Sequence, residues 1–199
     1  MKMKTNNLLT ITLCAILFSS CQNDSISPNN LPGMYENGYF VTNEGNFGTG
    51  NGSISYVSEN GNVENNIFSQ INSFQLGDVV HSMNIIDEKA YIVVNNSSKI
   101  EVANIDSMSS IATIQGLISP RYIEKVANNK AYVTDWGING IQVIDLTSNT
   151  IISTISTGTG PEELVVTNGY AYVCNVGGWE LDNSVSIIDV NSDMVVSTL

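Results

Sequence analysis

GYFVTN at residues 38–43, AYIVVN at 90–95, AYVTDW at 131–136 and AYVCNV at 171–176 are four versions of one short apolar stretch. Their tyrosines, Tyr39, Tyr91, Tyr132 and Tyr172, lie 52, 41 and 40 residues apart. A repeat of about forty residues built on short apolar strands is typical of β-propellers, in which each repeat folds as one blade. The repeat therefore predicts an all-β protein.

Each copy is followed by a loop rich in glycine and asparagine and then by further strands. In the second strand, at residues 140–146, Ile141 and Val143 alternate with other side chains, as expected of a half-buried strand. A third strand follows a turn and is predicted at residues 63–68 in the first repeat. A fourth strand precedes the next tyrosine, at residues 79–86, 122–127 and 164–167. Four antiparallel strands per repeat are what one blade requires, and no helix is predicted after the first twenty residues.

The two ends of the repeat region are incomplete in this pattern. No strand of the fourth kind precedes Tyr39, and Leu199 falls within or just after the third strand of the last repeat. We therefore expect about four blades, in a chain that is a fragment of a larger ring.

The first twenty residues have the pattern of a signal peptide. Lys2 and Lys4 precede an apolar run at residues 8–18, which is too short to span a bilayer and ends in small residues. The FSSC sequence at residues 18–21 resembles the lipobox of bacterial lipoproteins, which implies lipidation of Cys21. The alternative is an ordinary secreted protein. Residues 1–20 are thus predicted as signal peptide, 21–33 as a flexible tether and 34–199 as propeller repeats.

Acidic residues dominate the charge of the chain. Of seven bases, Lys2 and Lys4 leave with the signal peptide, so five bases face 19 acids in the mature part. Such a surface repels nucleic acid. Cys174 is the remaining cysteine once Cys14 and Cys21 are assigned to the signal and the anchor, and we expect it to be a buried, small apolar residue.

The loops after the tyrosine strands and the loops before the next blade are expected to open on one face. Aromatic side chains amid asparagine, glycine and acids on such a face suit a large flat or sugar-like ligand. The predicted ligand-binding residues are Asn46, Phe47, Asn95, Tyr122, Asp135, Trp136, Asn175 and Trp179. The alternative for each tryptophan is that it caps the apolar gap between two blades.

Other polar patterns predict no site. Residues 189–193 mimic the start of a calcium loop, but Met194 stands where glycine is required, so a β-turn is favoured. His81 is the only histidine and has no partners for a zinc site or a catalytic triad. The adjacent Glu162 and Glu163 are expected in a solvated turn. We therefore predict no metal, no cofactor and no catalytic residue.

The repeat region resembles the YVTN family of propellers found on bacterial and archaeal surfaces. The residues that carry the resemblance are the Tyr-Val-Thr strand openings, the Ile-Asp steps that end at Asp145 and Asp189, and the turn at Gly160, Pro161 and Glu162. The second repeat departs from this pattern at Val93 and Val94.

Together with NEGNFG at residues 43–48 behind a lipobox, the chain is similar to surface lipoproteins of gut Bacteroidota that capture vitamin B12. The resemblance implies about seven blades in the complete fold and a non-catalytic, lipid-anchored outer-membrane protein exposed on the cell surface. It also implies capture of cobalamin or another corrinoid for an outer-membrane transporter. The fold alone leaves two alternatives, a glycan-binding or adhesion propeller and, less favoured, a lactonase-like hydrolase.

Overall fold

The computed structural model describes Tyr35 and residues 37–199, so the predicted signal peptide, the lipobox with Cys21 and the whole predicted tether lie outside the described residues. The first sheet comprises β1 (Gly38–Asn43), β2 (Ser53–Ser58) and β3 (Val63–Glu64). The second comprises β4 (Val80–Ile86), β5 (Lys89–Val94), β6 (Lys99–Asn104) and β7 (Ser110–Ile114). The third comprises β8 (Pro120–Ala127), β9 (Lys130–Asp135), β10 (Gly140–Asp145) and β11 (Thr150–Ser156). The fourth comprises β12 (Pro161–Thr167), β13 (Tyr170–Asn175), β14 (Val185–Asp189) and β15 (Met194–Thr198).

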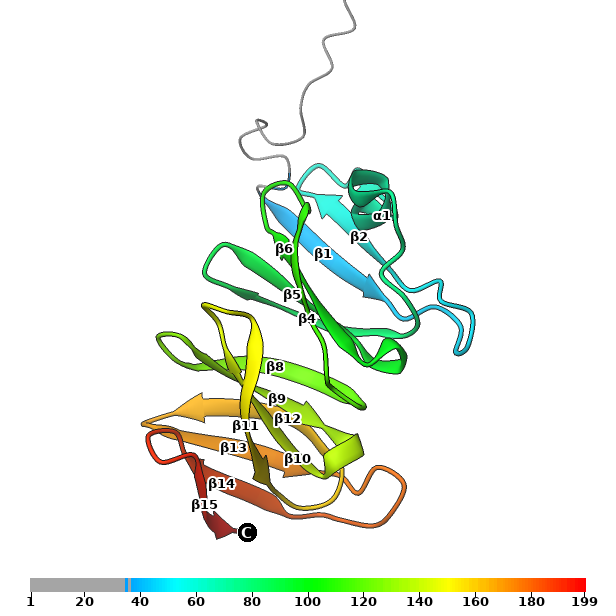
Figure 1. Ribbon diagram of the computed structural model, residues 1–199. Helices are drawn as coiled ribbons and strands as arrows, with labels where there is room; N and C mark the ends of the chain where they lie inside the picture. Colours follow the sequence, from blue (N-terminus) through cyan, green and yellow to red (C-terminus); the bar gives the residue numbers. More distant parts are fainter. Residues whose placement is uncertain (1–34, 36) are drawn as a thin grey trace, which may run out of the picture.

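Each sheet is an antiparallel meander, because every strand pairs with its neighbour in sequence. Figure 1 shows the four sheets following one another as successive blades, with α1 (Ile67–Asn72) beside the first. The first strands of the last three blades run together, since β8 contacts both β4 and β12. The predicted all-β fold of propeller blades is therefore confirmed. No helix among residues 37–199 is long and apolar enough to cross a membrane.

The end of the first blade differs from the prediction. β3 has only two residues, and α1 follows where the strand was expected to continue. Ile67 and Phe68 are both buried although they are adjacent, whereas a strand would turn them to opposite faces. Asn66 and Ser73 adopt left-handed φ angles of 56° and 62°, so the chain reverses at both ends of this short helix.

Apolar side chains fill the three spaces between consecutive sheets. Tyr91 lies in the space between the second and third sheets, and Tyr132 in the space between the third and fourth. The Tyr91 hydroxyl donates a hydrogen bond to Oδ1 of Asn149 at 3.3 Å, and the Tyr132 hydroxyl donates to Oδ1 of Asp193. Asn149 and Asp193 occupy the left-handed position of the outer hairpin turn in the following blade. Each tyrosine thus ties its blade to the next.

Phe40, rather than Tyr39, is the first-blade equivalent of these tyrosines. Asn43 donates to the hydroxyls of Ser53 and Ser55 on β2, and Asn175 makes the same pair of bonds to Ser184, just before β14, and Ser186 on β14. Counting back three residues from each asparagine gives Phe40 and Tyr172. Phe40 packs against the core between the first two sheets, while Tyr39 is 72% exposed. The predicted alignment of the first repeat was wrong by one residue.

The partner position also changes at this first interface. In the outer turn of the second blade, Met108 takes the left-handed position that Asn149 and Asp193 hold in later blades. Met108 is fully buried in the cluster against which Phe40 packs. At the first interface, therefore, Phe40 has no hydroxyl to donate, and Met108 has no side-chain oxygen to accept a hydrogen bond.

The turn prediction for residues 189–193 is confirmed. Oδ1 of Asp189 accepts hydrogen bonds from the backbone N–H groups of Asn191 at 2.8 Å and Ser192 at 3.2 Å. The expected burial of Cys174 is wrong, because this cysteine is exposed on β13. Val173 and Asn175, its neighbours, are buried, so alternation turns Cys174 to the opposite face of the fourth sheet.

Candidate functional site

Two sets of loops meet at one end of the blades, as the sequence predicts. The loops after β5, β9 and β13 hydrogen-bond to the segments that lead into β4, β8 and β12. The backbone bonds run from the N–H groups of Asn95, Trp136 and Val176 to the carbonyls of Val79, Ser119 and Gly160, at 2.8, 3.0 and 3.0 Å. Side chains from both sets are therefore presented together.

β4, β8 and β12 each contain a bulge just after their first residue. A bulge breaks the regular pairing and re-aims the side chain that it carries. The residue after the first position is His81 in β4, Arg121 in β8 and Glu162 in β12. Three consecutive blades thus place a titratable or charged side chain at the same structural position.

These three side chains form one polar network. Arg121 donates two hydrogen bonds to Glu162, from Nε to Oε2 at 2.9 Å and from Nη2 to Oε1 at 2.8 Å. Nε2 of His81 lies 3.5 Å from Oε1 of Glu162, and its Nδ1 lies 3.3 Å from Oε1 of Glu44 in the loop after β1. The network therefore connects all four blades.

Aromatic rings extend the network on both sides. The Arg121 guanidinium lies over the Trp136 ring, 4.2 Å from its centroid, in a cation–π contact. Trp136 meets Trp179 edge to face with centroids 6.0 Å apart, and Tyr122 meets His81 in the same way at 5.1 Å. We call this set the rim band; its members are Glu44, His81, Arg121, Tyr122, Trp136, Glu162 and Trp179.

The environment of Glu162 keeps it ionised. Burial raises the pKa of this carboxyl, but the nearby His81 and the two hydrogen bonds from Arg121 outweigh burial and lower the pKa to about 2. Burial also raises the pKa of Tyr122, and the carboxylates of Glu162 and Glu163 raise it further. The rim band thus holds a fixed negative charge, paired with Arg121, beside a neutral phenol.

Residues 37–199 match the family described as "Domain of unknown function (DUF5074)". The chain belongs to the DUF5074 family. No curated protein matches the sequence.

Solved structures similar to this DUF5074 chain share its fold. Hydrazine synthase of Kuenenia stuttgartiensis superposes with a TM-score of 0.66 at 20% identity, over 84% of this chain and 47% of that chain. The WD40 β-propeller domain of Doa1 superposes with a TM-score of 0.55 at 17% identity, over 73% of this chain and 46% of that chain. Dihydro-heme d1 dehydrogenase NirN in complex with DHE superposes with a TM-score of 0.54 at 15% identity, over 74% of this chain and 34% of that chain. The DUF5074 chain spans less than half of each, so these likenesses concern the fold alone.

Three of the predicted binding residues lie together in the DUF5074 rim band. Trp136, Trp179 and Tyr122 belong to it, and Trp179 is 93% exposed. Phe47 is also exposed, and Asn46 precedes it in the same loop. This loop is held in place because Gly48 N–H donates to Oδ2 of buried Asp78 at 2.7 Å.

The other three predicted residues serve the scaffold. Asp135 is fully buried, and its carboxylate accepts backbone N–H bonds from Ile118, Ser119 and Gly137. Asn175 is buried and donates to the hydroxyls of Ser184 and Ser186, while Asn95 donates to the Ser119 hydroxyl and to the Pro120 carbonyl. The hydrogen bonds of all three residues therefore hold neighbouring loops and strands together, and a contact with a ligand stays a prediction.

Sequence reasoning missed the ionic half of the rim band. Glu162 was expected in a solvated turn, but its side chain is only 20% exposed and is bound by Arg121. The available signal was the common offset of His81, Arg121 and Glu162 from the start of each first strand. Among the described residues, no group of three or more His, Cys, Asp or Glu could hold a metal ion.

Proposed function

We propose that this DUF5074 protein is a non-catalytic binding propeller that captures a corrinoid, such as cobalamin, on its rim band. The exposed Trp179, set edge to face against Trp136, is the observation that carries the proposal. A large exposed indole offers apolar area to a flat ligand. A corrin ring is broad and edged with amide groups, which both donate and accept hydrogen bonds.

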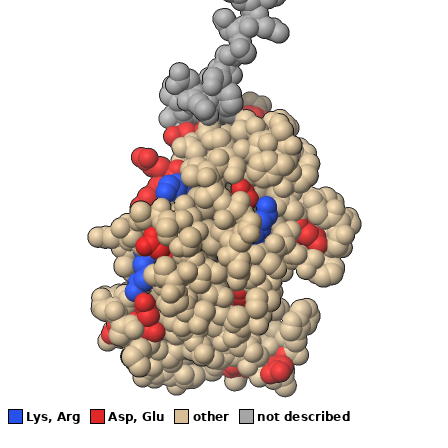
Figure 2. Space-filling model, viewed as in Figure 1, with Lys and Arg blue, Asp and Glu red and all other residues tan. Residues whose placement is uncertain are grey.

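The surrounding charges suit such a ligand. Arg121 and Glu44 lie at the two sides of the polar network, and Glu44 is 59% exposed. They offer a donor and an acceptor to amide side chains, and Asn46 in the neighbouring loop offers both. Figure 2 shows a largely uncharged face with scattered acids and few bases. A surface of this kind favours a neutral, amide-rich ligand over a polyanion.

The neighbours of His81 support binding over catalysis. Its two nitrogens face Glu44 and Glu162, and within the described residues no serine, threonine or cysteine hydrogen-bonds to it. A nucleophile–base pair would require such a contact. Glu162 is engaged by Arg121, so it is not placed as a free general base.

Calorimetry on the full chain tests the ligand class. We expect saturable heat with cobinamide or cobalamin, accompanied by quenching of tryptophan fluorescence. Heat with an oligosaccharide and none with either corrinoid would replace this proposal with the glycan-binding alternative.

Substitution of Trp179 tests the proposed contact. We expect Trp179→Ala to weaken corrinoid binding by about 1–3 kcal/mol, because the buried area of one large side chain is lost. Tyr39→Ala is the matched control, since Tyr39 is an exposed aromatic residue at the opposite end of β1 from the loop that carries Phe47. Equal affinities for the two variants would contradict the assignment of the site to the rim band.

The cellular setting is part of the same proposal. Lipidation of Cys21 would hold the propeller at the outer membrane, exposed on the cell surface, where it passes ligand to an outer-membrane transporter. Cys21→Ser is expected to release the protein from the membrane fraction into the soluble fraction. Membrane association that survives this substitution would rule out the lipid anchor.

A further inference from the structure

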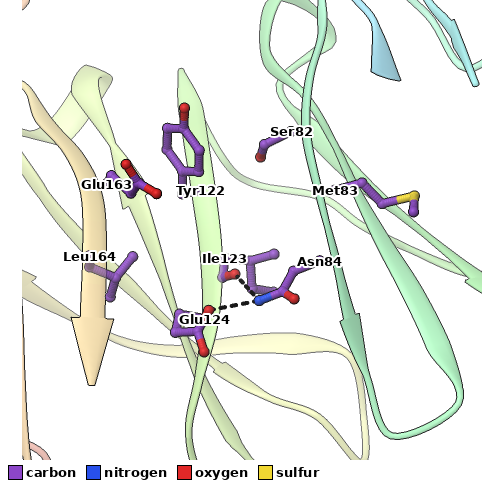
Figure 3. A pocket seen from close by; sticks show the side chains of 8 residues that line it. All are labelled: Ser82, Met83, Asn84, Tyr122, Ile123, Glu124, Glu163 and Leu164. Carbon is purple, nitrogen blue, oxygen red and sulfur yellow. Dashed lines mark hydrogen bonds between the residues drawn. The ribbon is translucent and has the colours of Figure 1, made fainter. Parts of the chain in front are cut away.

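A pocket of about 230 Å³ lies between the first strands of the last three blades. Figure 3 shows Ser82 and Asn84 of β4 facing Tyr122 and Glu124 of β8, with Glu163 of β12 beside the phenol. The residues that line the pocket are Ser82, Met83, Asn84, Tyr122, Ile123, Glu124, Glu163 and Leu164. Only Tyr122 is shared with the rim band.

Most of the hydrogen-bond donors in this pocket are bound to acceptors of the protein itself. The Ser82 hydroxyl donates to the Arg121 carbonyl at 2.6 Å. Nδ2 of Asn84 donates to the Ile123 carbonyl at 3.0 Å and to Oε2 of Glu124 at 2.7 Å. The Tyr122 hydroxyl is the donor that these contacts leave open.

Acceptors, in contrast, remain open. Among the contacts of the described residues, Oε1 of Glu124, both carboxylate oxygens of Glu163 and Oδ1 of Asn84 accept no hydrogen bond. A ligand that fits this lining must bring several donors of its own. An ammonium group has three N–H donors and no acceptor.

The negative charge of the pocket also favours an ammonium group. Glu124 and Glu163 are its charged lining residues, and no lysine or arginine lines it. The cations next to Glu124 and Tyr122 in sequence are committed elsewhere: Lys125 contacts Asp87 at 2.6 Å, and Arg121 holds Glu162 in the rim band. The two pocket carboxylates therefore lack a cationic partner among the described residues.

Apolar side chains complete the lining. Ile123 and Leu164 are 3% and 5% exposed and present hydrocarbon to the cavity, and the Tyr122 ring adds an aromatic surface. A short alkyl chain can bury itself against these groups. We propose that this pocket binds a small primary alkylamine, with its ammonium group between Glu124 and Glu163 and its chain against Ile123 and Leu164.

The inference does not depend on corrinoid binding, and the test uses n-butylamine as the probe. We expect saturable shifts in the amide NMR spectrum of the full chain, including the Asn84 side-chain N–H₂ signals, at about millimolar affinity. n-Butanol, which has the same length but no charge, and butyrate, which has the opposite charge, should produce no saturable shift.

Charge-neutralising variants locate the site. We expect Glu124→Gln to weaken butylamine binding roughly tenfold or more, because a charge-assisted hydrogen bond is lost. Glutamine retains an oxygen that can accept from Asn84, so the strand contact is preserved. Glu163→Gln should also weaken binding, whereas Glu59→Gln, at an exposed acid in the turn between β2 and β3, should leave it unchanged.

Acidity provides an independent readout. Burial raises the pKa of Glu124, although the hydrogen bond from Asn84 opposes this, so the carboxylate is neutralised sooner than usual as pH falls. The amine stays protonated in this range, and affinity for butylamine should therefore fall as Glu124 takes up its proton. Absence of shifts at about 10 mM butylamine, equal binding of n-butanol, or an equal loss in Glu59→Gln would each overturn the proposal.

Discussion

Replacing Tyr132 by alanine should lower the free energy of unfolding by about 3–5 kcal/mol. The ring is fully buried between the third and fourth blades, and its hydroxyl donates to Asp193. Burial and the Asp193 carboxylate both raise the pKa of Tyr132, so the hydroxyl is protonated, and donates, at neutral pH. Urea unfolding followed by circular dichroism measures the change.

Two further variants separate the ring from its hydroxyl. Tyr132→Phe keeps the packing and loses only the bond to Asp193, so we expect a loss of about 1.5–3 kcal/mol. Tyr39→Ala, at a ring that is 72% exposed, should change the unfolding free energy by less than about 0.5 kcal/mol. A loss at Tyr39 comparable to that at Tyr132 would contradict the corrected alignment of the first repeat.

Glu162→Gln should lower the free energy of unfolding by roughly 3 kcal/mol at neutral pH. This energy follows from the lowering of the Glu162 pKa from 4.5 to about 2, at about 1.4 kcal/mol per pKa unit. The substitution removes the charge that Arg121 and His81 hold in place. Glu163→Gln is the matched control, because the adjacent Glu163 side chain is exposed and a change of less than about 0.5 kcal/mol is expected.

The same prediction has a definite pH dependence. Because the folded-state pKa lies below the unfolded value, the stabilisation from Glu162 is fully present above about pH 4.5. It is lost as pH falls from there through about 2, where the folded protein also becomes protonated. The difference between wild type and Glu162→Gln should therefore narrow over this interval. A difference that stays constant down to pH 2 would show that charge is not its cause.

The blades could be predicted from sequence because their strands repeat at a nearly constant spacing. The first repeat is the exception: Tyr39 matches the other tyrosines by residue type, but Phe40 occupies their place in the fold. Residue type and position conflict there, and the hydrogen bonds of Asn43 together with the exposure of Tyr39 decide between them. The helix α1 was missed for a related reason, since Ile67 and Phe68 in isolation suit a strand.

The candidate site could be predicted only in its aromatic half. Trp136 and Trp179 could be predicted as binding residues because they are large aromatic residues at related places in two adjacent repeats. His81, Arg121 and Glu162 are about forty residues apart in sequence and chemically unlike, so no short motif contains them. A bulge in each first strand brings them together. Burial likewise cannot be read from a polar residue type, so the sequence did not show that Asp135 is fully buried and bound by backbone N–H groups.

The exchange of Phe40 and Met108 for the usual tyrosine and asparagine or aspartate has a consequence for assembly. Blades that share one fold can dock in the wrong order, and misdocking of similar units is a characteristic error of repeat proteins. Here a phenol that must meet an oxygen would be left unsatisfied against the Met108 turn. Phe40, in turn, would leave Asn149 or Asp193 without its tyrosine hydroxyl. The difference between the first interface and the later ones would therefore disfavour misdocked blades, because a wrong neighbour loses a buried contact.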